Sequence, residues 1–419
     1  MSDQLHSDAH SAVPPVPSAV STGSLPCAGC GAGLEYSPGD SELLCPYCGV
    51  KTPVTGGAEP VAAAVEELDF REWLARAAEA PENLHEVTTA RCTGCGAQTT
   101  LAENVVADSC PFCASSLVAA DASAKLVRPR ALLPFKVTRT DAERLLEDWV
   151  KGLWFAPNDF KTHARREGGV NGIYVPCWTY DAATTTHYTG QRGEHYYETE
   201  AYTETNDKGE TETKTRQVQR TAWYSTSGTV RLDFDDLLVM ASGSLPPKQA
   251  AALQPWDMDA LVSFSDEYLR GFRAESYSVP LDQGFEQAKV AMDPEIRGAI
   301  ERDIGGDKQR IGSMDTRYED VSFKHVLLPV WIGAWKHRDR VYRRMVNART
   351  GEVQGERPYS PVKIALLVLF ILAVLATVFF VYQSNHPHAV STTTYGWLHE
   401  TRATFATEDV RQLEVRIAA

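Results

Sequence analysis

Eight of the nine cysteines fall into two sets that share one spacing, C-x2-C-x14-C-x2-C. Each set offers four thiolates on two short knuckles, which is the ligand set of a tetrahedral structural zinc site. Four protein ligands leave no coordination position for water or substrate, so we predict zinc sites that hold structure and do not catalyse. The predicted ligands are Cys27, Cys30, Cys45 and Cys48 in the first site and Cys92, Cys95, Cys110 and Cys113 in the second.

Disulfide pairing is the alternative for the same cysteines. The first residues, MSDQLHSDAH, have neither the basic flank nor the apolar stretch of a secretory signal. Paired C-x2-C knuckles are typical of a reducing compartment, where thiols persist and bind metal. These two observations favour zinc over disulfides.

The segments that carry the cysteines are an internal repeat. CAGCGA at 27–32 matches CTGCGA at 92–97, and CPYC at 45–48 matches CPFC at 110–113. We therefore predict two zinc ribbons, ribbon 1 at 25–50 and ribbon 2 at 90–118. Glycine follows the last cysteine of ribbon 1 but Ala114 follows that of ribbon 2, which predicts a slightly looser knuckle there. The residues that could contact a partner, or else pack within the ribbons, are Leu34, Tyr36, Tyr47 and Phe112.

The rest of the N-terminal third joins the ribbons. Residues 1–24 are rich in Ser, Pro and Ala without apolar periodicity, which predicts a disordered tail. Residues 51–89 read as a linker followed by an amphipathic helix, because Phe70, Trp73, Leu74 and Ala77 recur at helical spacing.

Residues 125–360 predict a strand-rich α+β body. Its main features are an apolar strand at 172–182, a long Thr-rich hairpin at 195–224, and a strand pair at 325–353. Helices are expected from a capping box at Thr140, over 281–291, and from Asp293-Pro294 to Ile304. Val175-Pro-Cys-Trp178 and Leu328-Pro-Val-Trp331 share a pattern, so two related halves, about 125–245 and 255–355, stay open as an interpretation.

One apolar segment has the length of a membrane span. Ile364–Val381 contains no charged residue and would form a helix about 27 Å long, close to the hydrocarbon thickness of a bilayer. We predict a transmembrane helix at 362–382; a buried core helix is the alternative. Basic residues precede the span, which places the body in the cytoplasm and the tail at 383–419 outside the cell membrane. These basic residues are Arg343, Arg344, Arg349, Arg357 and Lys363.

Composition argues against several functions. The net charge of −14 and the mildly acidic ribbons disfavour a surface that neutralises nucleic-acid phosphates. The chain contains no Gly-Lys dipeptide, hence no Walker-type phosphate loop, and neither G-x-S-x-G nor H-E-x-x-H. Cys177 could be a catalytic thiol with His187 or His195 as its base, but a small buried core residue is the more common case. His386 and His388 are a weak metal pair, and Asp235 and Asp236 should point to opposite faces of a strand.

The order of ribbons, body and anchor resembles a bacterial family of zinc-ribbon, single-span membrane proteins. The resemblance rests on the ribbons and on four stretches of the body: RPRALLPFKV at 128–137, GFRAESYSV at 271–279, DIGGDKQRI at 303–311 and FKHVLLPVWIGAWKHRDRVYRRMVNARTGEVQGERPYS at 323–360. Members are often labelled as related to the primosomal protein N′, a superfamily II helicase. This chain lacks the ATPase motifs of a helicase. The resemblance also implies association with flotillin-like (SPFH) and phage-shock-protein-A-like proteins.

Together these features predict a non-enzymatic adaptor that binds two Zn²⁺ ions and the lipid bilayer through 362–382, and recruits protein partners to the cytoplasmic face of the membrane. The rival hypothesis is a zinc-dependent nucleic-acid-binding factor of replication or repair. An enzyme with its cleft in the strand-rich body is a second rival.

Overall fold

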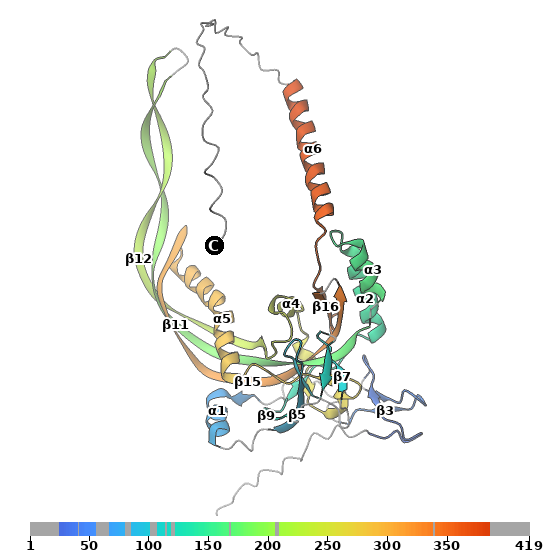
Figure 1. Cartoon of the computed structure of the whole chain (residues 1–419). Coiled ribbons are helices and arrows are strands. Elements are labelled where there is room, and N and C mark those ends of the chain that lie inside the picture. The colour runs from blue at the N-terminus through green and yellow to red at the C-terminus, as the bar shows by residue number, and fades with distance from the viewer. Residues whose placement is uncertain are drawn as a thin grey trace, which may run out of the picture. The chain divides into compact units, whose positions relative to one another are not determined.

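The computed structural model divides the chain into two compact units, Met1–Tyr359 and Ser360–Ala419 (Figure 1). The predicted tail at 1–24 and most of the predicted outer tail, from residue 386 onward, lie outside the described residues, and so do His386 and His388. The described residues are 25–40, 42–55, 67–79, 85–100, 107–113, 115–118, 122–166, 169–205, 209–337 and 340–385.

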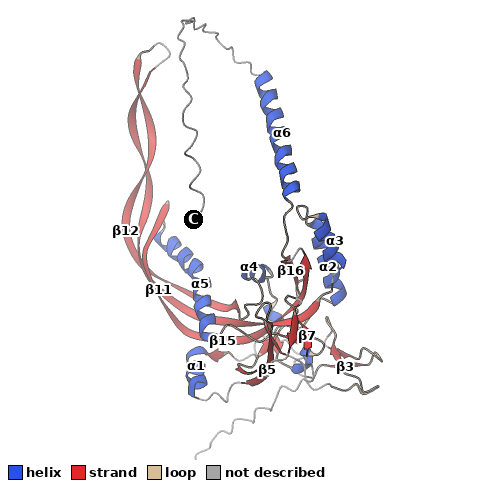
Figure 2. Ribbon diagram, viewed as in Figure 1, coloured by secondary structure: helices blue, strands red, loops and turns tan. Residues whose placement is uncertain are grey.

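A mixed sheet built on three very long strands forms the centre of the first unit (Figure 2). The central strand β11 pairs antiparallel with β12 on one side and with β15 on the other. Shorter strands complete the sheet, so the chain is strand-rich α+β, in agreement with the predicted fold class. The members are β11 (Asn171–Thr205), β12 (Thr211–Met240), β15 (Lys308–His337), β10 (Ala131–Leu132), β13 (Val262–Ser263), β14 (Arg273–Ala274), β16 (Arg340–Asn347), β17 (Val353–Gly355) and β4 (Leu68–Asp69).

Burial along β11 explains its mixed sequence. From Ile173 to Tyr180 every side chain is buried, because helices and loops cover both faces of the sheet there. From Ala182 to Tyr188 buried and less buried residues alternate, as expected where only one face is covered. Beyond Glu194 the strand is almost wholly exposed. A continuous apolar run thus changes into a polar alternation within one strand.

The long predicted hairpin is present and is longer than its sequence indicates. The pairing of β11 with β15 ends at Gly193 and Lys308, whereas β11 and β12 stay paired to Thr205 and Thr211. Residues 194–205 and 211–222 therefore form a two-stranded hairpin segment that projects past the sheet, and we call it the arm (Figure 1). Residues 206–208 at its turn lie outside the described part of the chain.

The helices depart from expectation in two places. The cap of the first body helix is Thr138, whose hydroxyl accepts a hydrogen bond from the backbone N–H of Asp141, and not Thr140. The two helices expected around Asp293-Pro294 are one continuous helix with Pro294 inside it. Proline leaves the carbonyl of Val290 without its helical donor, and Val290 lies on the exposed side of the helix, where water can replace that donor. The helices of this unit are α1 (Phe70–Glu79), α2 (Arg139–Gly152), α3 (Asn158–Arg166), α4 (Pro247–Ala252) and α5 (Leu281–Ile304).

The ribbons form small sheets of their own. Ribbon 1 extends slightly past its predicted end, because its third strand finishes at Pro53. The strand β9 pairs with ribbon 2, so that ribbon also continues beyond residue 118. The strands are β1 (Glu35–Tyr36), β2 (Glu42–Leu44) and β3 (Lys51–Pro53) in ribbon 1, and β5 (His85–Arg91), β6 (Gln98–Thr100), β7 (Ala107–Ser109), β8 (Ser116–Val118) and β9 (Ala122–Leu126) around ribbon 2.

The second unit is described over a single helix, α6 (Pro361–Asn385). Its segment Pro361–Tyr382 contains an 18-residue window with a mean hydropathy of 3.2 and is long and apolar enough to cross a membrane. The hydroxyl of Thr377, the polar residue within its apolar stretch, donates to the carbonyl oxygen of Ala373 at 2.8 Å. The helix therefore satisfies this hydroxyl internally, as a lipid environment requires.

Candidate metal centres

The four cysteines of ribbon 1 converge at the tips of two turns. Their sulfur atoms all lie within 4.8 Å of one another. Cys27 Sγ is 3.4 Å from Cys48 Sγ, and Cys30 Sγ is 3.5 Å from Cys45 Sγ. A tetrahedral ion with bonds of about 2.3 Å would separate its sulfur ligands by about 3.8 Å, whereas a disulfide needs about 2.05 Å. The geometry therefore fits a shared metal ion better than disulfide bonds.

Backbone geometry brings these ligands together. Gly31 and Gly49 adopt φ values of +77° and +73°, which side chains larger than hydrogen rarely tolerate. Each glycine donates its N–H to the carbonyl oxygen of the first cysteine of its knuckle, Cys27 or Cys45. The N–H of Gly29 points at Cys27 Sγ at 3.3 Å, which stabilises negative charge on that sulfur.

Ribbon 2 repeats this arrangement. Cys92 Sγ lies 3.4 Å from Cys113 Sγ, and Cys95 Sγ lies 3.6 Å from Cys110 Sγ. Gly96 has a φ of +77° and donates to the carbonyl oxygen of Cys92, as Gly31 does in ribbon 1. Ala114, the residue expected to loosen the knuckle, lies outside the described residues. Each predicted set of four cysteines thus meets at one point and could hold one metal ion.

One thiol in each cluster has a lowered pKa, whereas burial in ribbon 2 and neighbouring thiols in ribbon 1 raise the pKa of other ligands. Hydrogen bonds from the backbone N–H groups of Cys48 and Tyr47 lower the pKa of Cys45 to about 6. Burial opposes ionisation of Cys113, but hydrogen bonds from Ser115 outweigh it and lower the pKa of that thiol to about 7. A thiolate is the form that binds a metal, so each cluster contains at least one sulfur prepared for ligation near neutral pH.

The two knuckle tips differ sharply in exposure. The side chain of Tyr47 in ribbon 1 is 83% exposed, whereas Phe112, its counterpart in ribbon 2, is completely buried. The carbonyl of Phe112 also accepts a hydrogen bond of 2.7 Å from Nε of Arg343 in β16. Of the four predicted contact residues, Leu34 and Tyr36 are buried as well, so Tyr47 alone can contact a partner.

Cys177 is a core residue. It is fully buried in β11, with its sulfur 3.3 Å from Sδ of Met240, and burial raises its thiol pKa well above the usual range. The two histidines considered as its base lie farther along the same strand. His187 contacts Thr229, and His195 Nδ1 lies 3.6 Å from a carboxylate oxygen of Asp307. The structure therefore does not assemble a Cys–His pair from these residues.

Asp236 belongs to a buried charge cluster that sequence analysis missed. Lys324 is only 5% exposed, and its ammonium lies 2.8 Å from Asp236 and 3.0 Å from Glu67. The hydroxyl of Ser322 lies 2.8 Å from the carboxylate of Glu67 and 2.9 Å from that of Asp181 in the same cluster. Burial raises the pKa of Asp181 to about 6, whereas hydrogen bonds with Asp181, Ser322 and Lys324 lower that of Glu67 to about 2. Through Glu67, the cluster holds the segment before α1 against the sheet.

A second missed group lies where ribbon 2 meets the body. Glu275 is 3% exposed and accepts hydrogen bonds from the hydroxyls of Ser242 and Ser244. Its backbone forms an antiparallel β-bridge with Thr99, in β6 of ribbon 2. Burial raises the pKa of this carboxyl to about 7, with the two serines opposing the shift. Glu275 lies within one of the stretches that carry the family resemblance, but its neighbours in sequence give no sign of burial.

Glu275→Gln is expected to remove a pH dependence of stability. Because the folded-state pKa of about 7 lies above the ordinary 4.5, the group's contribution is complete below pH 4.5 and is lost as pH rises through 7. Between pH 5 and pH 8 the wild type should lose about 2 to 3 kcal/mol that the glutamine variant keeps. Urea unfolding of the detergent-solubilised chain at both pH values measures this difference.

Exposed Glu352→Gln is the matched control for Glu275→Gln, and it should follow the wild type. Metal content is measured at both pH values, so that loss of metal is not mistaken for titration. Parallel pH profiles for wild type and Glu275→Gln would contradict the prediction.

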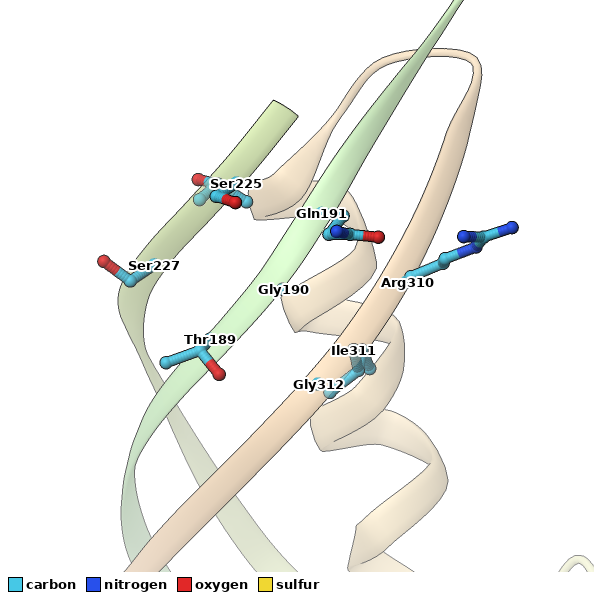
Figure 3. Close-up of a pocket in the computed structure, with 9 residues that line it drawn as sticks. Thr189, Gly190, Gln191, Ser225, Ser227, Arg310, Ile311 and Gly312 are labelled. Atoms are coloured by element: carbon cyan, nitrogen blue, oxygen red, sulfur yellow. The ribbon is translucent and has the colours of Figure 1, made fainter. Parts of the chain in front are cut away.

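The base of the arm carries an open polar hollow of about 770 Å³ (Figure 3). Thr189 and Gln191 line it from β11, Ser225 and Ser227 from β12, and Arg310 from β15. The guanidinium of Arg310 also stacks over the ring of Trp223 at 3.7 Å. The lining residues include no carboxylate, imidazole or thiol, so this hollow offers no acid–base pair for catalysis.

Comparison with known proteins adds little about function. The chain is similar to the uncharacterized protein YdjG of Bacillus subtilis (strain 168), with 24% identity over 250 residues that cover 59% of this chain and 69% of that protein. No family profile matches the chain, and no solved structure matches it.

Proposed function

We propose that this chain is a membrane-anchored adaptor that binds two structural zinc ions and recruits protein partners at the cytoplasmic face of the membrane. The observation that carries the proposal is the combination of two closed four-cysteine clusters with a helix apolar enough to span a bilayer. Clusters with four protein ligands can organise a recognition surface, but they have no open position for a reaction. Zinc is the metal that such all-thiolate tetrahedral sites prefer.

The charge flanking α6 supports a cytoplasmic body. Three of the basic residues before the helix are hydrogen-bonded in the folded body: Arg343 to Phe112, Arg344 to Ala164 and Arg349 to Pro134. All three precede the helix in the chain, and the positive-inside rule keeps the basic flank of a span in the cytoplasm. The same compartment keeps thiols reduced for metal binding.

The expected partners follow from the family resemblance. Flotillin-like (SPFH) and phage-shock-protein-A-like proteins act at the membrane surface, where the ribbons of this chain would face the cytoplasm. Nucleic acid is disfavoured as a partner because ribbon 1 carries Glu35, Asp40 and Glu42 against Lys51. The rival factor of replication or repair would bind single-stranded DNA in a salt-dependent way, and we expect no such binding above background.

Co-purification from membranes tests the proposal. The full chain and a Cys30→Ser/Cys48→Ser variant are extracted in mild detergent, and the proteins that accompany each are compared. The adaptor role requires partners that the wild type retains and the variant loses. A topology reporter at the C-terminus should report an external position. Identical partners for both forms, or a cytoplasmic reporter, would overturn the proposal.

A further inference from the structure

The two ribbons are not equivalent surfaces, and this difference deepens the proposed adaptor function, on which the inference rests. In ribbon 2 three of the four ligands and the knuckle residue Phe112 are buried against the body. In ribbon 1 Cys30 and Cys48 are exposed, and so is Tyr47, which precedes Cys48 in the chain. Ribbon 2 is therefore part of the body, whereas the knuckles of ribbon 1 are available to another molecule.

The opposite side of ribbon 1 is fixed to the body. The ring of Tyr36 packs edge-on against Tyr268, with centroids 5.1 Å apart. Its backbone N–H donates to Arg270, and the backbone and hydroxyl of Thr55 both donate to the carboxylate of Glu267. These contacts hold the knuckles in one orientation, so little conformational entropy would be lost when a partner binds.

The charge of this surface is negative. The two positive charges of one Zn²⁺ ion and the four negative charges of its thiolates sum to −2 at the metal. The exposed residues Cys30 and Cys48 present part of that charge to solvent. The acidic side chains of ribbon 1 outnumber its lysine, and Lys51 already pairs with Asp40 at 3.4 Å and Glu42 at 2.8 Å. Anionic lipid headgroups and nucleic-acid phosphates would be repelled by such a surface.

We propose that the knuckles of ribbon 1 bind a basic, arginine-containing segment of a partner protein. A guanidinium can lie on the exposed ring of Tyr47 and gain a cation–π interaction. Its remaining N–H groups can donate to the sulfurs of the exposed residues Cys30 and Cys48, since a thiolate accepts hydrogen bonds. Aromatic ring, thiolate acceptors and acidic rim thus all favour the same chemistry, and a tyrosine at the centre of such a surface is a common anchor.

A photo-crosslinker at position 47 tests the identity of the occupant in living cells. The full chain with Tyr47→p-benzoylphenylalanine is irradiated in its own membrane, and the crosslinked peptide is sequenced by mass spectrometry. Tyr197→p-benzoylphenylalanine, on the arm and 65% exposed, is the matched control. The proposal requires a segment of another protein with a net positive charge, captured at 47 and not at 197.

Four outcomes would overturn it: no product above the control, a crosslink to lipid, a crosslink to a second copy of this chain, or capture of a neutral or acidic segment. The adaptor role itself could survive each of these outcomes, because partner capture that depends on the ribbons but not on Tyr47 would place the docking surface elsewhere.

A binding measurement tests the proposed chemistry separately. The probe is a fluorescein-labelled decapeptide of alternating arginine and alanine, added to the full chain in detergent. Tyr47→Ala should weaken its binding about fivefold, the size of one cation–π contact. Tyr197→Ala should leave binding unchanged. Equal affinities for wild type and Tyr47→Ala would show that the peptide senses only the overall acidic charge and would contradict the proposal.

Discussion

Cys110→Ser is expected to reduce the bound zinc from two ions per chain to one and to unfold ribbon 2. Cys110 is 2% exposed and lies in a cluster with Phe112 and with Ile173, Val175 and Val330 of the sheet. A structural zinc ion contributes on the order of 10 kcal/mol to the folding of a small ribbon, because the unfolded segment has no preformed site. Loss of the ion should therefore remove the ribbon's own stability completely.

The effect should also reach the body. An unfolded ribbon 2 would uncover the apolar face of β11 and β15 that Phe112 covers, and Arg343 would lose its acceptor on ribbon 2. We expect a thermal unfolding midpoint at least several degrees lower for the detergent-solubilised chain. Elemental analysis of the same sample gives the zinc content.

Cys177→Ser is the control, because Cys177 is as buried as Cys110 but belongs to neither cluster. This variant should keep two zinc ions, so any fall in its unfolding midpoint would come from a hydroxyl buried in the core and not from a missing ion. A Cys110→Ser protein with two zinc ions, or a wild type with none, would contradict the metal assignment.

Lys324→Met is expected to cost about 2 kcal/mol of unfolding free energy, because water partly compensates the carboxylates of Glu67 and Asp236, which are 40% and 32% exposed. Lys324 is the cation among Glu67, Asp181 and Asp236, and it is nearly inaccessible to solvent. Burial opposes its charge, but the hydrogen bonds to Asp236 and Glu67 outweigh this and raise its pKa. Removing one partner of a buried ion pair leaves the other charge without compensation, which is the costly way to break such a pair.

The matched design removes the charges together. Lys324→Met combined with Glu67→Gln and Asp236→Asn should recover a large part of the loss, because no uncompensated carboxylate of the ion pairs remains. Urea unfolding of all forms at pH 7 measures the difference. A triple variant no more stable than Lys324→Met alone would show that packing around the lysine stem, and not its charge, carries the effect.

The ribbons were predictable because metal ligation fixes both residue type and spacing. The glycines beside the cysteines occupy the positive-φ positions that the turns require, as at Gly31 and Gly96. The apolar helix was also evident, because a bilayer-length run without charge is rare in other settings. Its first helical residue, Pro361, lies one residue from the predicted boundary.

Features that depend on contacts between distant parts of the chain could not be predicted from the sequence. Tyr47 and Phe112 occupy equivalent places in matching motifs, and only the body's cover over ribbon 2 separates an exposed ring from a buried one. The helix through Pro294 continues because the broken hydrogen bond faces solvent. Glu275 and Lys324 are buried ionisable groups whose partners are distant in sequence. A lysine inside the apolar stretch at 323–332 was the one signal that could have revealed the charge cluster around Lys324.

The two similar four-residue sequences, Val175–Trp178 and Leu328–Trp331, meet at the centre of the sheet. Their first residues, Val175 and Leu328, pair with each other. The indole of Trp178 donates to the carbonyl of Val279, just before the cap of α5, and that of Trp331 donates to the carbonyl of Val137, just before the cap of α2. Two related halves of the body, each contributing one of these strands, would give such matched contacts. The relation between the halves stays a prediction.

The place of β15 in the chain has a consequence for biosynthesis. β11 and β12 leave the ribosome as a hairpin with open edges, long before the strand that completes the centre of the sheet is made. β15 ends at His337 and β16 at Asn347, fourteen residues before α6 begins. The nascent body can close only when the apolar helix is about to emerge, so under the proposed membrane anchoring its final folding would coincide with delivery of the chain to the insertion machinery.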